Sequence, residues 1–207
     1  MRANVYIDAF NLYYGCIKGT PYRWLDLRAM SEKLLPKHSV KRIRYFTARV
    51  QARPDDPQIA QRQQTYLRAI RTIPGVTLHF GRFLSKPVRM PLVNPPAKGA
   101  KTVEVLRTEE KGSDVNLATH LLLDAFDGDF EVALVISNDS DLVEPISVVR
   151  ERFGLSVGVV NPHPNTSHAL QKVATFYRPL RKGVLASSLL ANQVTDSGGV
   201  ITKPLGW

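Results

Sequence analysis

The sequence predicts an α/β fold in which helices cover both faces of a mainly parallel sheet. Residues 132–136 form an apolar run without a polar face, which is typical of a strand buried on both sides, and residues 4–7 are interpreted in the same way. Residues 24–35 and 113–125 carry apolar side chains at helical spacing. Because strands and helices alternate along the chain, we expect a three-layer α/β/α sandwich.

The first half of the chain supplies three of the expected strands. After the strand at residues 4–7, the helix at residues 24–35 is followed directly by a proline that favours its end. Residues 42–50 are rich in strand-forming side chains. A helix over residues 56–73 then begins with an Asp-Pro pair and ends before Pro-Gly, and residues 76–80 alternate as a third strand does.

The second half supplies the other two strands and completes the expected topology. Its elements are a helix near 113–125, a strand at 132–136, a helix at 142–153, a strand at 155–160, a short helix at 167–173 and an extended end at 176–180. Right-handed crossovers and the usual reversal of strand order place the first and fourth strands side by side. The predicted order is therefore 3-2-1-4-5.

Length and composition indicate one soluble domain with a tail. The 207 residues are 43% hydrophobic and 22% charged, which is ordinary for a globular protein. We expect a domain over residues 1–182 and an appendage over residues 183–207, which leaves open a homodimer in which the tail wraps a second subunit. No apolar run reaches the ~18 residues of a membrane span. A single cysteine, Cys16, cannot form an internal disulfide, which fits a cytoplasmic protein.

The charge balance favours a polyanionic partner. There are 28 Lys and Arg against 18 Asp and Glu, so the formal net charge is +10. Residues 81–112 are rich in proline, lack helical periodicity and contain seven basic residues against three acids. We expect a protruding loop or hairpin there, with residues 102–106 as its more regular arm. Its basic residues, including Arg107 and Lys111, suit a phosphate backbone; a solvated loop is the simpler alternative.

Four aspartates are expected to meet at one edge of the sheet. Asp8 ends the first strand, Asp139 ends the fourth, Asp141 opens the helix beyond it, and Asp114 lies in the first turn of the helix that leads into the fourth strand. Helix capping alone explains one acid at residues 137–141 but explains two less well. Crowded carboxylates need protonation or a bound cation, and oxygen ligands alone indicate Mg²⁺ or Mn²⁺.

This arrangement predicts hydrolysis of a nucleic-acid phosphodiester. A divalent ion in such a site holds a phosphate oxygen, helps to ionise the attacking water and neutralises the leaving oxygen. Asn11 is a candidate for orienting a ligand or the water, and Ser137 and Asn138 are candidates for hydrogen bonds to the phosphate. No glycine-rich dinucleotide or Walker loop is present, which argues against a dehydrogenase or an NTPase.

Two other groups of side chains are not expected to form sites. The acids Asp124, Asp127, Asp129 and Glu131 lack the spacing of a calcium loop and are interpreted as a solvated turn at the opposite edge of the sheet. His163 and His168 lie five residues apart in a polar loop without a nearby cysteine, so a metal site there is not predicted.

Three motifs together resemble those of the NYN domain family, which belongs to the PIN-like nucleases. They are Asp-Ala-Phe-Asn at residues 8–11, Glu-Lys-Gly-Ser-Asp at residues 110–114 and Ser-Asn-Asp-Ser-Asp at residues 137–141. Asn138 departs from the family pattern, where glycine is usual, and Ser113 stands where an apolar residue is common.

This resemblance covers about residues 4–180. It implies a PIN-like sandwich and metal-dependent ribonuclease activity, with Asp8, Asp114, Asp139 and Asp141 on the acidic positions of the family site. The alternative, from another functional class, is a non-catalytic RNA-binding or regulatory protein that retains the fold and the charge.

Overall fold

A six-stranded parallel sheet forms the centre of the molecule. The structure, a computed structural model, describes residues 1–52 and 54–207. The sheet has the order β3-β2-β1-β6-β7-β8, and every pairing in it is parallel. Its strands are β1 (Arg2–Asp8), β2 (Ser39–Thr47), β3 (Val76–Phe80), β6 (Val132–Ile136), β7 (Ser156–Asn161) and β8 (Phe176–Pro179). The predicted fold class is confirmed, and the five predicted strands keep their order.

The one addition to the predicted sheet is its sixth strand. The segment that the sequence indicated as an extended end forms β8, which pairs with β7 from Gly158–Phe176 to Asn161–Pro179. Pro179 lacks a backbone N–H and sits at the sheet edge, where no further strand needs that donor. Gly158 lies directly under the ring of Phe176, so a side chain at residue 158 would collide with that ring.

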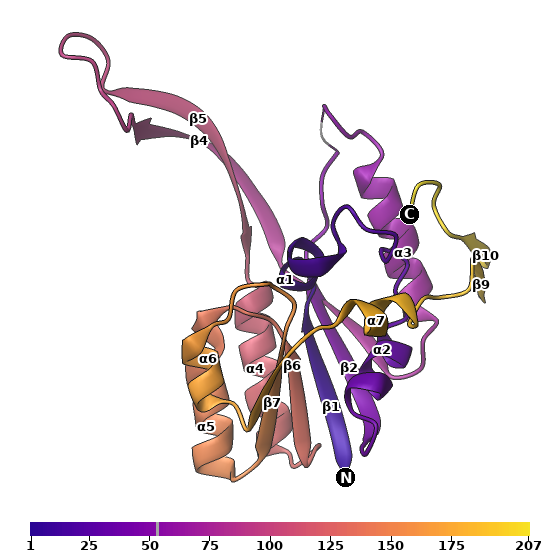
Figure 1. The fold of residues 1–207 in the computed structure, drawn as a ribbon. Helices are drawn as coiled ribbons and strands as arrows, with labels where there is room; N and C mark the ends of the chain where they lie inside the picture. The colour runs from indigo at the N-terminus through magenta and orange to yellow at the C-terminus, as the bar shows by residue number, and fades with distance from the viewer. Residues whose placement is uncertain (53) are drawn as a thin grey trace.

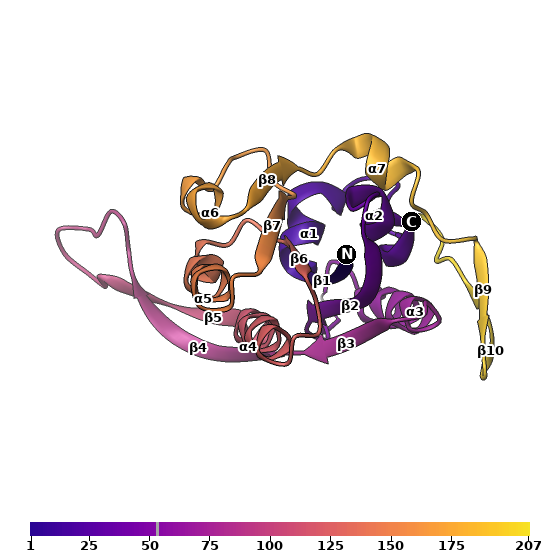
Figure 2. The ribbon, with the colours of Figure 1, turned by 90° about the horizontal axis from the view of Figure 1, so that it is seen from below.

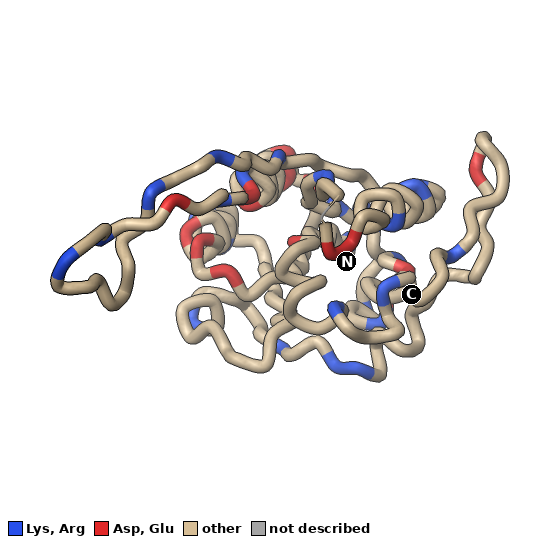
Figure 3. Tube along the Cα trace, turned by 90° about the horizontal axis from the view of Figure 1, so that it is seen from above, with Lys and Arg blue, Asp and Glu red and all other residues tan. Residues whose placement is uncertain are grey.

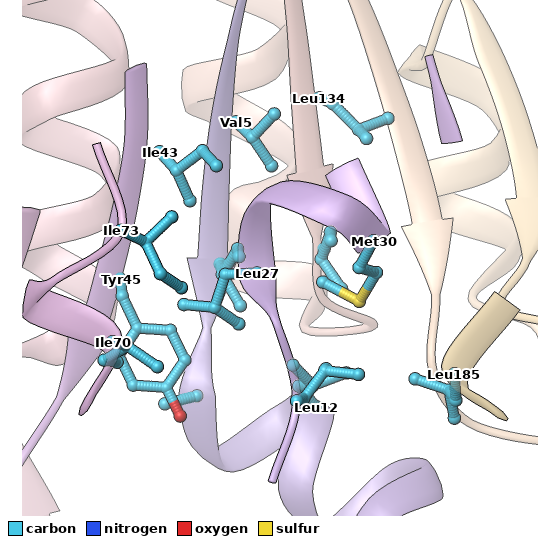
Figure 4. Close-up of a cluster of buried hydrophobic side chains, with 14 of the residues drawn as sticks. Val5, Leu12, Leu27, Met30, Ile43, Tyr45, Ile70, Ile73, Leu134 and Leu185 are labelled. Atoms are coloured by element: carbon cyan, nitrogen blue, oxygen red, sulfur yellow. The ribbon is translucent and has the colours of Figure 1, made fainter. Parts of the chain in front are cut away.

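Helices cover the two faces of the sheet (Figure 2). Each face of the sheet has its own hydrophobic core. Successive residues of β1 point to opposite faces, so Val5 and Ile7 lie in one core and Tyr6 lies in the other. The first core is covered by α2 (Leu27–Leu34), α3 (Ile59–Arg71) and α7 (Lys182–Ala186), and the second by α4 (Ser113–Phe126), α5 (Val143–Phe153) and α6 (His168–Val173). Figure 4 shows Val5, Ile43 and Leu134 of the sheet facing helix residues of the first core.

Residues 82–111 form a long antiparallel hairpin that projects from the body (Figure 1). Its strands are β4 (Arg82–Pro91) and β5 (Thr102–Lys111), paired in register from Arg82–Lys111 to Pro91–Thr102. The sequence expectation of a protruding loop or hairpin therefore corresponds to this arm. Lys and Arg are distributed along it, as Figure 3 shows.

The C-terminal segment lies against the body. After α7 it forms a small hairpin of β9 (Gln193–Asp196) and β10 (Gly199–Thr202). Trp24 Nε1 donates a hydrogen bond to the Ala191 carbonyl at 2.7 Å, and Asp196 pairs with Arg68 of α3. The ring of Trp207 packs against Tyr66 with 5.9 Å between centroids. None of the helices in the described part of the chain combines the length and apolarity needed to cross a membrane.

At the other edge of the sheet Asp127 and Glu131 are exposed, as the predicted solvated turn requires, but Asp124 and Asp129 are not free in solvent. Asp124 is only 4% exposed and accepts hydrogen bonds from Arg44 Nε at 2.7 Å and from the Tyr6 hydroxyl at 2.6 Å. Asp129 accepts from Arg42 Nε at 2.6 Å. These pairs join the end of α4 to β1 and β2, so this cluster serves the fold.

Candidate active site

Three of the four predicted aspartates line one open cavity at the C-terminal edge of the sheet. We call it the acidic cavity; its volume is about 350 Å³. Asp8, Asp114 and Asp139 line it together with Glu110, which the sequence argument did not select. Asp141 is exposed on the adjoining 3₁₀ turn η2 (Ser140–Leu142) and does not line the cavity.

The end of β1 places Asp8 at the bottom of this site. Ile7 pairs with Ile136 of β6, so Asp8 and Ser137 follow side by side where the two strands end. Asp8 is the N-cap of α1 (Ala9–Leu12): one carboxylate oxygen accepts from the Asn11 backbone N–H at 3.0 Å, and the other accepts from the Ser137 hydroxyl at 3.1 Å. Burial raises the pKa of Asp8 above its usual range, and the Asp139 carboxylate raises it further, against these hydrogen bonds.

The turn after β6 is fixed by hydrogen bonds among the predicted substrate-binding residues. Ser137 is fully buried, and its hydroxyl accepts from the Asp139 N–H at 3.1 Å. The Asn11 side chain accepts from the Asn138 N–H at 2.9 Å. Asp139 caps η2 by accepting from the Asp141 N–H at 3.1 Å, so helix capping does describe its local role. Asp139 also lines the cavity, where its carboxylate can have a second role in binding a ligand.

The Asn138 side chain makes hydrogen bonds to the loop after β7. Its amide donates to the Asn165 carbonyl at 3.1 Å, and its oxygen accepts from the Tyr177 hydroxyl at 2.9 Å and from the Ser167 N–H at 3.1 Å. Asn138 therefore ties the turn after β6 to the loop after β7. The glycine that is usual here could not make these contacts.

The base of the long hairpin brings Glu110 to the cavity. Glu110 accepts from the Ser113 hydroxyl at 2.6 Å and from its N–H at 3.2 Å, which anchors the carboxylate at the start of α4 beside Asp114. Gly81 makes this possible, because a Cβ at residue 81 would collide with the Glu110 carboxylate and approach the Lys111 carbonyl to 2.6 Å. The available signal was the position of Glu110 at the start of the second motif.

His163 also lines the acidic cavity, although the sequence argument set it aside. Its loop packs against the π-helix η1 (Tyr13–Ile17) at Gly15, where a Cβ would approach the Pro162 carbonyl oxygen to 2.8 Å. Close approach of the two backbones therefore requires glycine there. No local pattern indicates this contact, since His163 lies on the loop after β7 and Gly15 lies near the start of the chain.

The two predicted basic substrate contacts lie on the hairpin outside the cavity lining. Arg107 and Lys111 are exposed on the same face of β5. Both pair with Glu109, Lys111 at 3.1 Å. They remain predictions as phosphate contacts.

The acidic cavity suits a hard divalent cation by its chemistry. Asp8, Glu110, Asp114 and Asp139 offer only oxygen donors, and burial together with the Asp139 carboxylate raises the pKa of Asp8, an effect that a bound cation would oppose. Within the described residues, no three His, Cys, Asp or Glu side chains are already close enough together to hold a metal ion. Binding one would therefore require these side chains to turn toward each other.

The parallel sheet, its two helical layers and the carboxylates at the ends of β1 and β6 define a PIN-like α/β/α protein. The family model described as the NYN domain matches residues 2–181, so the chain belongs to the NYN domain family. This confirms the resemblance seen in the three motifs. The family assigns a nuclease-like fold to the chain.

Two further relatives were found. The chain is 31% identical over 237 residues to a Pseudomonas putida (strain DSM 28022 / S16) protein named 6-hydroxy-3-succinoylpyridine 3-monooxygenase HspA, an alignment that covers 100% of this chain and 75% of the relative. A crystal structure of a protein of unknown function from Vibrio parahaemolyticus RIMD 2210633 matches with a TM-score of 0.53 and 18% identity, covering 91% of this chain and 96% of that one. The second likeness supports the fold alone.

Proposed function

We propose that the protein is a metal-dependent ribonuclease that hydrolyses RNA phosphodiester bonds at the acidic cavity. The observation that carries this proposal is that four carboxylates from separate parts of the chain, Asp8, Glu110, Asp114 and Asp139, line one open cavity. Uncompensated carboxylates are costly unless a cation joins them. The net charge of +10 favours a polyanionic substrate around them.

In this proposal Asp8, Asp114 and Asp139 are the primary ligands of Mg²⁺ or Mn²⁺, and Glu110 is a fourth oxygen donor. When bound, the ion supplies charge stabilisation to the phosphate oxygens and lowers the pKa of the attacking water. Asp141 acts as a further ligand or positions the water from the rim. Its exposure on η2 fits the second role better than the first.

The remaining polar residues position this set. Asn11 and Ser137 hold the turn after β6 through hydrogen bonds to Asn138 and Asp8, which fixes where Asp139 lies. Arg107 and Lys111 of the hairpin contact the phosphate backbone beyond the cleaved bond. Such contacts add affinity without sequence preference and weaken as salt rises.

The test is cleavage of labelled single-stranded and structured RNAs with Mg²⁺, with Mn²⁺ and with EDTA. Asp139→Asn is the matched variant, because asparagine caps a helical turn as well as aspartate does. We expect metal-dependent cleavage that falls at least about a hundredfold in the variant, while RNA binding changes little. Equal rates in variant and wild type, or cleavage that persists in EDTA, would contradict the assigned site.

The alternative within the family is a non-catalytic RNA-binding or regulatory protein. The hairpin with its exposed basic residues favours this alternative independently of the carboxylates. It predicts salt-sensitive RNA binding without cleavage under every metal condition, and binding that falls when Arg107 and Lys111 are replaced.

A second candidate function is oxygenation of a small pyridine acid. The Pseudomonas putida relative favours it, because its name states that reaction and its alignment covers the whole chain. The test is incubation with 6-hydroxy-3-succinoylpyridine, oxygen and a reduced nicotinamide, followed by mass measurement. Ring carbon 3 carries the succinoyl group, so oxygen added there displaces that side chain while the second oxygen atom leaves as water. A dihydroxypyridine without the side chain would support this candidate, and unchanged substrate would remove it.

A further inference from the structure

A second cavity lies beside the acidic one and has different chemistry. We call it the aromatic cavity; its volume is about 100 Å³, and seven of its fifteen lining residues are aromatic. Tyr66 and Tyr45 come from the body of the domain, Trp207 from the C-terminal segment, and Tyr13 and Tyr14 from η1. This volume is less than the ~150 Å³ of an apolar cavity that accepts benzene, so the aromatic cavity has room for one flat ring at most.

One positive charge lines this apolar cavity. Arg23 lines it, and its Nε is buried without a hydrogen-bond partner in the described part of the chain. The guanidinium makes a single long contact there, from Nη1 to the Gly206 carbonyl at 3.4 Å. A buried donor on a charged group costs free energy unless an acceptor meets it. Arg23 is therefore poised to receive an anionic acceptor.

Two other polar side chains of the lining already have partners. Gln63 donates to the Ala48 carbonyl at 2.9 Å and accepts from the Val50 N–H at 2.9 Å. The Tyr66 hydroxyl donates to the Leu25 carbonyl at 2.9 Å. Arg23 differs from these two because its buried Nε meets no acceptor among the described residues, and it presents a fork of N–H donors that matches a carboxylate or a phosphate.

The two cavities adjoin each other. Phe10, Tyr14 and Phe83 line both of them. Phe10 and Phe83 meet edge to face with 5.6 Å between centroids, so this pair forms part of the wall between the cavities. Tyr14 lies on η1, and π-helical segments of this kind are frequent at functional sites. A ligand in the aromatic cavity would lie next to the carboxylates.

From this geometry we propose that the aromatic cavity binds a planar aromatic ring that carries an anionic group, with the ring against the aromatic side chains and the anion on Arg23. Two sources offer this chemistry: one nucleotide of a bound RNA, or a free aromatic acid. The site stands on its own lining and does not depend on cleavage at the acidic cavity.

The experiment measures binding to the full chain by NMR of the two tryptophan indole N–H groups. Trp207 lines the aromatic cavity, whereas Trp24 is fully buried with its N–H on Ala191, so Trp24 serves as an internal reference. Trp207→Phe assigns the two signals. Nicotinate and benzoate represent free acids, and the four nucleoside 5′-monophosphates represent RNA units.

We expect saturable binding that shifts the Trp207 signal and leaves the Trp24 signal in place. Benzamide, which keeps the ring without the charge, and cyclohexanecarboxylate, which keeps the charge without aromaticity, each bind about tenfold or more weakly than benzoate. Arg23→Gln weakens the binding of the anionic probes by about tenfold or more, because it removes a charge-assisted hydrogen bond. Arg89→Gln on the exposed hairpin removes the same charge elsewhere and leaves binding unchanged.

Binding of the monophosphates alone assigns the cavity to RNA, and binding of the aromatic acids alone assigns it to a small molecule; either result supports the proposal. The proposal is overturned if no probe shifts the Trp207 signal at millimolar concentration, or if Arg23→Gln binds benzoate as wild type does. Should Arg23→Gln fail to fold, the comparison of benzoate with benzamide and cyclohexanecarboxylate in the wild-type chain decides the same question.

Discussion

Asp8→Asn is expected to stabilise the fold while it abolishes cleavage. Burial raises the pKa of the Asp8 carboxyl, and the neighbouring Asp139 carboxylate adds to this effect. At neutral pH the ionised group therefore costs free energy that a neutral amide of the same shape does not. The hydrogen bonds can persist, because the amide oxygen can accept from the Asn11 N–H and the amide nitrogen can donate to the Ser137 oxygen.

The magnitude follows from these opposing contributions. Each unit by which a folded-state carboxyl pKa exceeds its unfolded value costs about 1.4 kcal/mol once the group is ionised. A hydrogen bond to the neutral amide contributes roughly 0.5–1 kcal/mol less to folding stability than a hydrogen bond to the charged carboxylate. The net gain is the difference between these two contributions, and each 1 kcal/mol of it would raise Tm by about 2–4 °C for a chain of this size.

The assay is urea unfolding of both proteins between pH 4 and pH 8. The sign follows from the raised folded-state pKa: the native protein keeps the Asp8 proton more tightly than the unfolded chain, so wild-type stability falls as the pH rises through the folded pKa. The advantage of the variant is therefore small near pH 4 and largest at pH 7. Asp26→Asn is the control, since Asp26 caps α2 through the Arg28 and Ala29 N–H groups and asparagine caps equally well.

A variant less stable than wild type at pH 7, or a stability difference that does not change with pH, would refute this reasoning. Retained cleavage in a folded Asp8→Asn protein would separately remove Asp8 from the catalytic set. The two measurements distinguish an error in the electrostatics from an error in the assigned function.

Three further perturbations test other parts of the structure. Asp124→Asn leaves a buried arginine unpaired and should cost about 3–5 kcal/mol in urea unfolding, whereas Asp127→Asn on the exposed end of α4 should cost almost nothing. Burial lowers the pKa of His79 to about 4, so the free energy of unfolding should be highest above pH 6.5 and fall by roughly 1–2 kcal/mol as the pH drops toward 4. His79→Gln should flatten that pH dependence, and an unchanged slope would show that His79 does not cause it. Gly81→Ala should displace Glu110 and reduce metal-dependent cleavage by about tenfold or more, with circular dichroism unchanged; full activity would remove Glu110 from the site.

The strand ends were predictable because local chemistry decides them. Asp8 follows an apolar run directly and Asp139 lies three residues after another, and parallel strands end at one edge of a sheet, so their proximity followed from sequence alone. Glu110 was not predictable in the same way. It reaches the cavity through the path of the hairpin, which depends on the close approach of Gly81 to residues 110–113.

Long-range pairing explains the wrong prediction for Asp124 in the acidic cluster. In sequence Asp124 is one of several acids around Gly128, a pattern typical of a solvated turn. Its partners Tyr6 and Arg44 lie on β1 and β2, far away along the chain, and only the sheet register brings them together. The same limit applies to His163, whose place in the acidic cavity depends on a loop that packs on Gly15.

The aromatic cavity was hidden for a related reason. Tyr13 and Tyr14 are adjacent in the sequence, and adjacent aromatic residues are compatible both with base stacking and with core packing. The structure brings them to a cavity that also contains Trp207 and an Arg23 Nε that meets no acceptor among the described residues. Natural cores leave few buried donors unsatisfied, so an unpartnered Nε on a charged side chain that lines a cavity favours a binding role over a packing gap. Arg23 is therefore the residue whose substitution tells most about this part of the molecule.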